Sequence, residues 1–170
     1  MKIISIHAGK VSQIEHQGKV WPTAIVKKKI HGPVKLTKQG IEGDEIGNPS
    51  VHGGEGRALY AFGFKTYSLW KDVVAPERLK NSGLFGENLT LDEIDESQID
   101  VGDRFSIGDA LIEATGPRFP CFIMAEHLGF ADARNFLNQN KKSGVLFRVL
   151  KEGTLQEGME LKLTEKSPYN

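Results

Sequence analysis

Short apolar runs separated by glycine-containing turns are the feature that most constrains how this sequence folds. The chain has 19 glycines in 170 residues, and several stand beside Asp, Asn or Pro. These residue types favour turns, so the chain reverses direction often. Closely spaced short strands predict a mostly-β fold, a barrel or a sandwich, and not alternating βαβ units. We expect strands at residues 3–6, 24–26, 34–37, 89–91, 105–107, 111–115, 144–150 and 161–163.

Two segments have the spacing of helices. Aromatic and apolar residues recur every three or four positions after a glycine loop, at Tyr60, Phe64, Tyr67, Trp70 and Val74. This pattern predicts a helix with one buried stripe that ends near Pro76, and we interpret the aromatic residues as core and not as a cofactor box. A second, shorter helix is expected over residues 131–138.

Composition limits the domain organisation and the partners. The length fits one domain spanning residues 1–170, with a core over about residues 1–163 and a polar, frayed tail from residue 164 onward. Lys+Arg and Asp+Glu are both 22, and this zero net charge gives no argument for nucleic-acid binding. The single cysteine excludes an intrachain disulfide and suits a reducing compartment. With no signal peptide or membrane-length apolar run, we expect a cytoplasmic protein without a membrane partner.

The segment Gly116-Pro117-Arg118-Phe119-Pro120-Cys121 is the strongest candidate for a functional loop. Its two prolines each fix their own φ angle and push the preceding residue towards extended backbone, which predicts a stiff loop. The nearby cation of Arg118 lowers the pKa of a thiol, and a thiolate is a nucleophile or a soft metal ligand. On these residues alone, Cys121 is either such a group or a small apolar core residue.

Other polar residues stand where they would face a pocket. Glu87 and Asn88 lie at the mouth of the strand at residues 89–91, and His52 and Arg57 flank a glycine-rich loop. His52 has an alternative role, in which it only satisfies backbone groups of that turn. Arg148 interrupts an apolar strand, so it must reach solvent, a carboxylate or an anionic ligand.

Taken together, the sequence resembles the MOSC domain, which is shared with the C-terminus of molybdenum-cofactor sulfurases, and in particular its bacterial stand-alone, YiiM-like branch. The resemblance covers nearly the whole chain and keeps the family's order, and it implies a mostly-β fold, a closed or partly closed β-barrel with a few short helices. Two departures are visible: the run after Gly43-Asp44-Glu45 is Ile46-Gly47-Asn48 where the family usually has Gln-Ala-Asp, and larger YiiM-like proteins carry a further helical segment after the barrel. The matching runs are residues 23–27, 40–45, 52–54, 57–60, 85–89, 117–121 and 147–150.

The resemblance implies a role for each candidate residue. In this family the cysteine of the Pro-Arg-x-Pro-Cys run coordinates molybdenum in the cofactor or carries sulfur, which makes Cys121 the metal ligand and catalytic residue here. Molybdopterin is an anionic pterin phosphate and needs fixed cations and amide-like donors. We expect the remaining cofactor contacts to come from Arg118, Arg148, Asn88, Glu87, Lys10, Lys27, His52 and Arg57.

The function implied by the resemblance is a molybdenum-cofactor enzyme that reduces N-hydroxylated small molecules such as hydroxylaminopurines. Its electrons would come from a separate donor protein, because one cysteine cannot build a four-cysteine cluster within one chain. A non-catalytic carrier of molybdenum cofactor or sulfur is the first alternative. An ordinary β-barrel interaction domain with a structural cysteine is the second.

Overall fold

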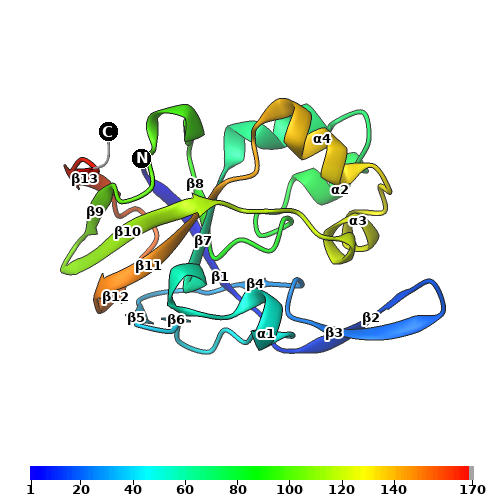
Figure 1. The fold of residues 1–170 in the computed structure, drawn as a ribbon, viewed down its shortest axis with the longest axis horizontal. Coiled ribbons are helices and arrows are strands. Elements are labelled where there is room, and N and C mark those ends of the chain that lie inside the picture. The colour runs from blue at the N-terminus through cyan, green and yellow to red at the C-terminus, as the bar shows by residue number, and fades with distance from the viewer. Residues whose placement is uncertain (169–170) are drawn as a thin grey trace.

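The fold is an eight-stranded, strongly curled sheet flanked by short helices, in a computed structural model that describes residues 1–168. Figure 1 shows the long strands β10 and β11 crossing the middle of the molecule, with helices α2, α3 and α4 together at one end. The strand order in the sheet is β13-β9-β10-β11-β7-β8-β1-β4, and two smaller sheets are formed by β12-β5-β6 and by the β2–β3 hairpin.

The elements follow in chain order. The strands are β1 (Ile3–Ala8), β2 (Ser12–His16), β3 (Lys19–Thr23), β4 (Lys28–Lys29), β5 (Val34–Thr37), β6 (Gly40–Ile41), β7 (Leu59–Gly63), β8 (Leu89–Leu91), β9 (Arg104–Ile107), β10 (Ala110–Pro117), β11 (Val145–Lys151), β12 (Gly153–Leu155) and β13 (Lys162–Glu165). The α-helices are α1 (Pro49–His52), α2 (Pro76–Leu79), α3 (Phe122–Leu128) and α4 (Ala133–Asn140), and the 3₁₀ helices are η1 (Glu55–Arg57), η2 (Phe64–Trp70) and η3 (Glu96–Gln98).

The sheet is a partly closed half-barrel, so the closed form of the expected barrel is wrong. Its edges are β13 and β4, and β4 is only two residues long. The start of β1 approaches the chain just before β13, where the Ile3 amide donates to the Met159 carbonyl at 2.8 Å and the Leu161 amide donates to the Met1 carbonyl at 2.8 Å. Here the two segments form only one isolated bridge, between Lys2 and Glu160. Because β1 and β13 are not joined by a continuous ladder, the barrel stays incomplete.

Two apolar clusters lie on opposite faces of β7. Leu59 and Ala61 pack in the barrel interior with the other sheet residues, whereas Tyr60 and Phe62 pack beneath α3, α4 and η2. All five residues of β7 are therefore buried. A strand covered on both faces lacks the alternation of a half-exposed strand, and this explains why its sequence resembles the start of a helix.

Several local expectations change accordingly. The helix predicted from Tyr60 is wrong: β7 occupies residues 59–63, η2 follows, and Pro76 begins α2 instead of ending a helix. The aromatic stripe is core as expected, except that Phe64 is exposed. The expected strand at residues 24–26 does not form. The Ile25 amide donates to the Thr23 hydroxyl at 3.1 Å, and this local bond replaces a hydrogen bond to a neighbouring strand.

The end of the chain is more ordered than its polar composition suggests. β13 continues to Glu165, and the amide of buried Ser167 donates to Asp103 at 2.8 Å. The frayed tail is thus wrong for residues 164–168, and its last part, residues 169–170, lies outside the described residues. Within residues 1–168 no helix is long and apolar enough to cross a membrane.

Candidate functional site

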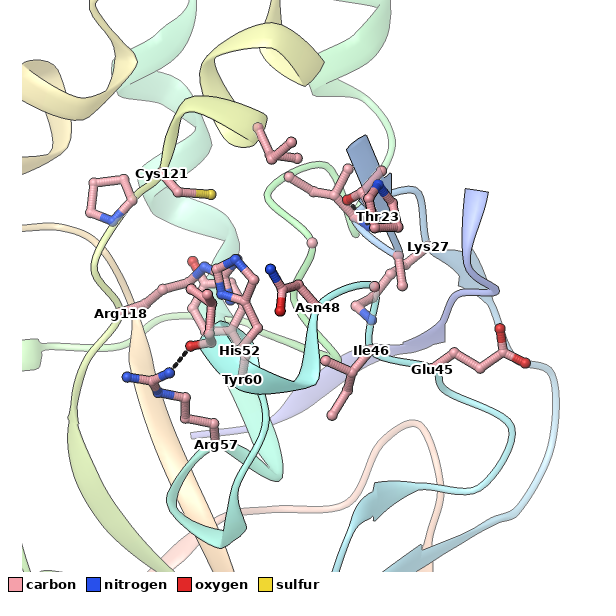
Figure 2. A pocket seen from close by; sticks show the side chains of 18 of the residues that line it. Thr23, Lys27, Glu45, Ile46, Asn48, His52, Arg57, Tyr60, Arg118 and Cys121 are labelled. Atoms are coloured by element: carbon pink, nitrogen blue, oxygen red, sulfur yellow. Dashed lines mark hydrogen bonds between the residues drawn. The ribbon is translucent and has the colours of Figure 1, made fainter. Parts of the chain in front are cut away.

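A cavity of about 430 Å³ opens between the base of the β2–β3 hairpin, the loop that leads into α1, and the start of α3. Its walls come from residues 21–27, 44–52 and 118–123, with Arg57, Tyr60, Gly86, Asn88 and Leu146 completing the lining. Figure 2 shows side chains from these separate segments converging on one space. Because the segments are far apart in sequence, the cavity exists only in the folded chain.

Cys121 lies on the wall of this cavity. β10 ends at Pro117, and the Arg118 amide donates to the carbonyl of Gly144, the residue just before β11, at 3.3 Å, which ties the loop to the start of that strand. Pro120 is buried, and Cys121 follows at the N-cap position of α3, half-buried and free of any disulfide. Figure 2 shows its sulfur directed into the cavity. The stiff loop predicted from the two prolines therefore presents the thiol to the cavity.

Arg118 carries a hydrogen-bond donor without a partner. Its guanidinium carbon lies 4.6 Å from the centre of the Tyr60 ring, a cation–π contact that fixes the side chain at the cavity wall. The Nε atom is buried and makes no hydrogen bond within residues 1–168. Buried polar groups in native structures nearly always have partners, so this donor is a place where a bound anion would be accepted.

Arg57 and His52 line the same cavity from the α1–η1 segment. The Arg57 guanidinium donates to the Val51 carbonyl, which anchors it to that segment. Burial lowers the pKa of His52, and the nearby cations of Arg118 and Arg57 lower it further. The imidazole is therefore neutral at pH 7 and offers hydrogen bonds without charge.

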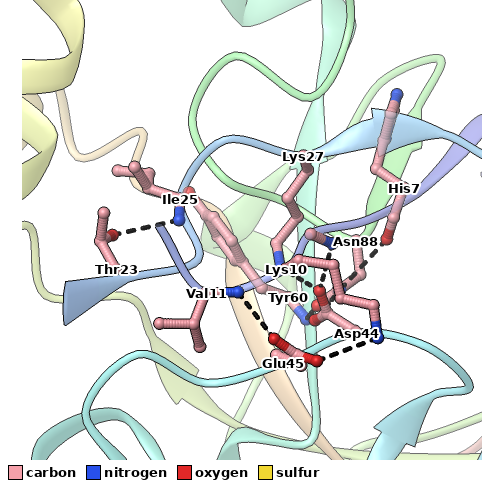
Figure 3. A network of polar contacts seen from close by, with 11 residues as sticks. His7, Lys10, Val11, Thr23, Ile25, Lys27, Asp44, Glu45, Tyr60 and Asn88 are labelled. Atoms are coloured by element: carbon pink, nitrogen blue, oxygen red, sulfur yellow. Dashed lines mark hydrogen bonds and ion pairs between the residues drawn. The ribbon is translucent and has the colours of Figure 1, made fainter. Parts of the chain in front are cut away.

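Lys27 and Asn88 belong to a buried polar network on the opposite wall (Figure 3). The Lys27 ammonium lies 2.6 Å from the Asp44 carboxylate, and both side chains are buried or nearly so, with exposed fractions of 7% and 16%. Burial lowers the pKa of Lys27, while Asp44 opposes that change. The Asn88 amide donates to Asp44 at 2.7 Å and accepts the Tyr60 amide at 3.2 Å.

Three expected contact residues lie away from the cavity lining. Glu87 is fully buried, and its carboxylate accepts hydrogen bonds from Tyr67, Gly83, Phe85 and Thr90. Lys10 is exposed and pairs with Glu45 at 3.0 Å. Arg148 is exposed on β11 and lies 3.4 Å from Glu113 of β10, so it reaches both solvent and a carboxylate.

The structure adds residues that the sequence pattern did not single out. Asp44, Tyr60 and Asn48 line the cavity, the first at the centre of the polar network and the second beneath Arg118. The sequence indicates a turn at Gly43-Asp44. The local sequence does not predict that the Asp44 carboxylate bonds to distant segments of the chain. Tyr60 was hidden because its strand has the pattern of a helix.

The cavity brings together cations, uncharged hydrogen-bonding groups and one thiol. Lys27, Arg57 and Arg118 provide cations, and Asn88 and His52 provide uncharged hydrogen-bonding groups. Within residues 1–168 no group of three or more His, Cys, Asp or Glu side chains is arranged to hold a metal ion. A metal at Cys121 would therefore need its other ligands from a bound organic group.

Comparison with known proteins gives the family. The MOSC domain model matches residues 48–162. The chain is 34% identical over 164 residues to Protein YiiM of Escherichia coli, covering 96% of this chain and 72% of that one. It is 31% identical to a protein named Reductase from Gibberella moniliformis, covering 98% of this chain and 30% of that one. The crystal structure of YiiM from Geobacillus stearothermophilus superimposes with a TM-score of 0.76 at 31% identity, over 96% of this chain and 75% of that one. The protein is thus a member of the MOSC domain family, with YiiM proteins among its relatives.

Proposed function

We propose that this protein binds the molybdenum cofactor with Cys121 as the protein ligand to the metal, and that it reduces N-hydroxylated small molecules. The observation that carries the proposal is the meeting of one thiol and several cations at a single cavity, where Arg118 keeps a buried donor unused. MOSC domains are associated with molybdenum-cofactor sulfurases, and the fungal relative is named a reductase. Both facts favour redox chemistry at this thiol.

The residues present fit the cofactor. Its phosphate is an anion, and Arg118, Arg57 and Lys27 supply fixed positive charge at the cavity. Its pterin is a planar ring system with hydrogen-bonding edges, for which His52 offers a neutral imidazole. Asn88 offers the second acceptor position of its side-chain oxygen, because its Nδ2 already donates to Asp44 and to the His7 carbonyl. Glu87, Lys10 and Arg148 do not enter this assignment, because their side chains point into other contacts.

The protein's own contribution is binding and placement. Arg118 holds its guanidinium against the Tyr60 ring, and the proline-flanked loop fixes the thiol on the same wall. When bound, the cofactor would supply the two-electron chemistry that breaks an N–O bond. The N–OH compound is thereby converted to the corresponding N–H compound and one water molecule. The two electrons come from a separate donor protein and the two protons from solvent. We place this activity in the cytoplasm, where the lone thiol stays reduced.

The thiol gives a direct test, because Cys121 is the only cysteine in the chain. Protein prepared in a host that makes the cofactor should contain molybdenum, and its thiol should resist a maleimide reagent until the cofactor is removed. Cys121→Ser should lose the metal while keeping its fold. Full metal content in Cys121→Ser would show that the sulfur is not a ligand.

Turnover separates the proposed enzyme from a carrier. Loaded protein supplied with an artificial electron donor should reduce a hydroxylamine or an N-hydroxylated base. Protein that holds molybdenum through Cys121 and never turns over would be the non-catalytic carrier.

A further inference from the structure

Asp44 joins three separate segments at the wall of the cavity. One carboxylate oxygen accepts the Gly9 amide at 2.7 Å and the Lys27 ammonium at 2.6 Å. The other accepts the Asn88 amide at 2.7 Å. These donors come from the turn after β1, the stretch after β3 and the residue just before β8 (Figure 3). One side chain thus fixes both of the polar groups that this wall offers to a ligand.

Lys27 has hydrogen-bonding capacity left over. An ammonium carries three N–H donors, and the structure gives Lys27 a single acceptor, Asp44, within residues 1–168. The side chain is 7% exposed, so bulk water reaches it poorly. Arg118, across the same cavity, also has an unused buried donor. Two cations with unmet donors facing one cavity favour an anionic ligand between them.

We infer that Asp44 is a positioning residue of this anion site, whose carboxylate keeps the Lys27 side chain charged and directed at the cavity. The inference rests on the proposed function only in that the cavity receives an anionic group. Asp44 itself is negative and would repel that group, so its benefit must pass through Lys27. The effect of removing Asp44 should therefore depend on whether Lys27 is present.

The groups around Lys27 determine in which direction the loss of Asp44 shifts the Lys27 pKa. Burial disfavours the ammonium, and the cation of Arg118 does so as well, whereas Asp44 and the more distant Glu87 favour it. His7 of β1 is also close enough to interact with Lys27, and burial keeps that imidazole neutral at pH 7. Removing the carboxylate of Asp44 takes away the counter-charge in direct contact, so Lys27 should lose its proton at a lower pH.

The experiment measures sulfate binding by calorimetry between about pH 7 and about pH 10, because sulfate keeps its charge over that range. All proteins carry Cys121→Ser, which removes the thiol as a titrating group in the cavity. The parent should bind sulfate with an affinity that falls at alkaline pH. Asp44→Asn should move that fall to lower pH by about one unit or more. Lys27→Met should bind about tenfold more weakly at neutral pH, and adding Asp44→Asn to it should not weaken binding further, because without Lys27 the Asp44 carboxylate only repels the anion.

Two further variants keep the test decisive if Asp44→Asn folds poorly. Lys27→Arg retains Asp44 and a charge that does not titrate, so its sulfate affinity should be independent of pH. Asp103→Asn is the matched control, because buried Asp103 also pairs with a lysine, Lys166, at 3.0 Å but lies outside the cavity lining. It should lower stability and leave the pH profile unchanged.

The inference is overturned if the parent and Asp44→Asn profiles coincide, if Asp44→Asn weakens sulfate equally without Lys27, or if Lys27→Arg shows the parent's alkaline fall. Its failure is distinct from failure of the proposed function. If the cofactor does not protect Cys121 from maleimide but the sulfate affinities change with pH as predicted, the molybdenum proposal is rejected and the Asp44 inference is kept. If the cofactor protects the thiol but Asp44→Asn does not change the pH dependence of sulfate binding, the Asp44 inference is rejected and the molybdenum proposal is kept.

Discussion

At the scale of single residues, neighbouring contacts decide which of the charged side chains serve the cavity. Arg118 and Arg148 look equivalent in the sequence, since each interrupts a segment of apolar or rigid residues. In the fold, Arg118 lies over Tyr60 with its Nε unused, and Arg148 lies beside Glu113 on the exposed side of the sheet. The first is available to a ligand and the second is already neutralised by a carboxylate.

This difference predicts unequal effects of two matched substitutions. Arg118→Met should weaken retention of the cofactor about tenfold or more, because it removes a buried charged donor. Arg148→Met should change retention by less than about twofold, because exposed ion pairs contribute little. Molybdenum content after dialysis, together with the rate of Cys121 labelling, measures both. Equal losses in the two variants would contradict the assignment.

Glu87 is predicted to act on stability and not on binding. Its buried carboxylate accepts the Tyr67 hydroxyl at 2.6 Å, the Gly83 and Phe85 amides at 2.8 and 3.0 Å, and the Thr90 hydroxyl at 2.7 Å. Glu87→Gln replaces one acceptor oxygen with a donor, which leaves buried donors unmet and should cost about 3 kcal/mol in free energy of unfolding.

Urea unfolding at pH 7 measures this loss. Glu93→Gln is the control, because Glu93 is an exposed partner of Lys65 and its loss should leave the urea midpoint nearly unchanged. Cofactor affinity of the folded Glu87→Gln protein should match the parent. If Glu87→Gln were as stable as the parent but bound the cofactor more weakly, Glu87 would be a binding residue after all.

At the scale of elements, turn chemistry carried most of the fold prediction. The strands β1, β5, β8, β9, β10 and β11 fall where short apolar runs meet glycine turns. β7 was missed because both of its faces are buried, and α3 because Cys121 at its N-cap offers no side-chain cap bond and only Gly129 marks its end. The local loop revealed Cys121 and Arg118. By contrast, the pairing of Arg148 with Glu113 depends on the register of β11 against β10, which no local pattern encodes.

The β2–β3 hairpin supplies part of the cavity wall, and its base contacts the loop at Gly47. A Cβ atom at Gly47 would lie 2.5 Å from the Thr23 Cα and 2.7 Å from the Thr23 nitrogen, both backbone atoms. Gly47→Ala should therefore displace the hairpin base, lower stability by about 1–3 kcal/mol, and weaken cofactor binding. Thermal unfolding and molybdenum content are the measurements.

Gly56→Ala is the matched control for that substitution. A Cβ atom there would meet nothing nearer than the Thr115 methyl at 3.7 Å. This variant should keep both stability and binding. If Gly47→Ala behaved the same way, the hairpin would not be held by this contact.

At the scale of the whole molecule, the cavity adjoins one of the two apolar clusters, the one on the helix side of the sheet. The barrel cluster and the helix-side cluster share the sheet, and Tyr60 belongs to the second while it also lines the cavity. Asn88, the residue just before β8, links β7 to β1, because its side chain bonds to the Tyr60 amide and to the His7 carbonyl. Global stability and the shape of the cavity are therefore coupled, and a buried titratable group in this region affects both.

His7 is that group, and it predicts how stability depends on pH. Its side chain is 1% exposed, and its Nδ1 atom has no hydrogen-bond partner within residues 1–168. Burial lowers the pKa of His7, with Glu87 opposing, whereas the unfolded chain titrates at about 6.5. Below that pH the unfolded state takes up a proton that the folded state refuses. The free energy of unfolding should thus be highest above about pH 6.5 and fall by up to about 1.4 kcal/mol per pH unit for each such histidine as the pH drops.

His52 and His127 have pKa values lowered by burial as well, so they add to the loss in the same window. His7→Asn should be less stable than the parent at pH 7 but show a shallower decline between about pH 6.5 and about pH 5, which lies above the range where carboxylates titrate. The exposed His31 gives the control, since His31→Asn should follow the parent curve. Urea unfolding at half-unit pH steps measures the slopes. A decline that begins only below about pH 4.5 in the parent would assign acid unfolding to carboxylates, and the buried imidazole of His7 would then have no part in it.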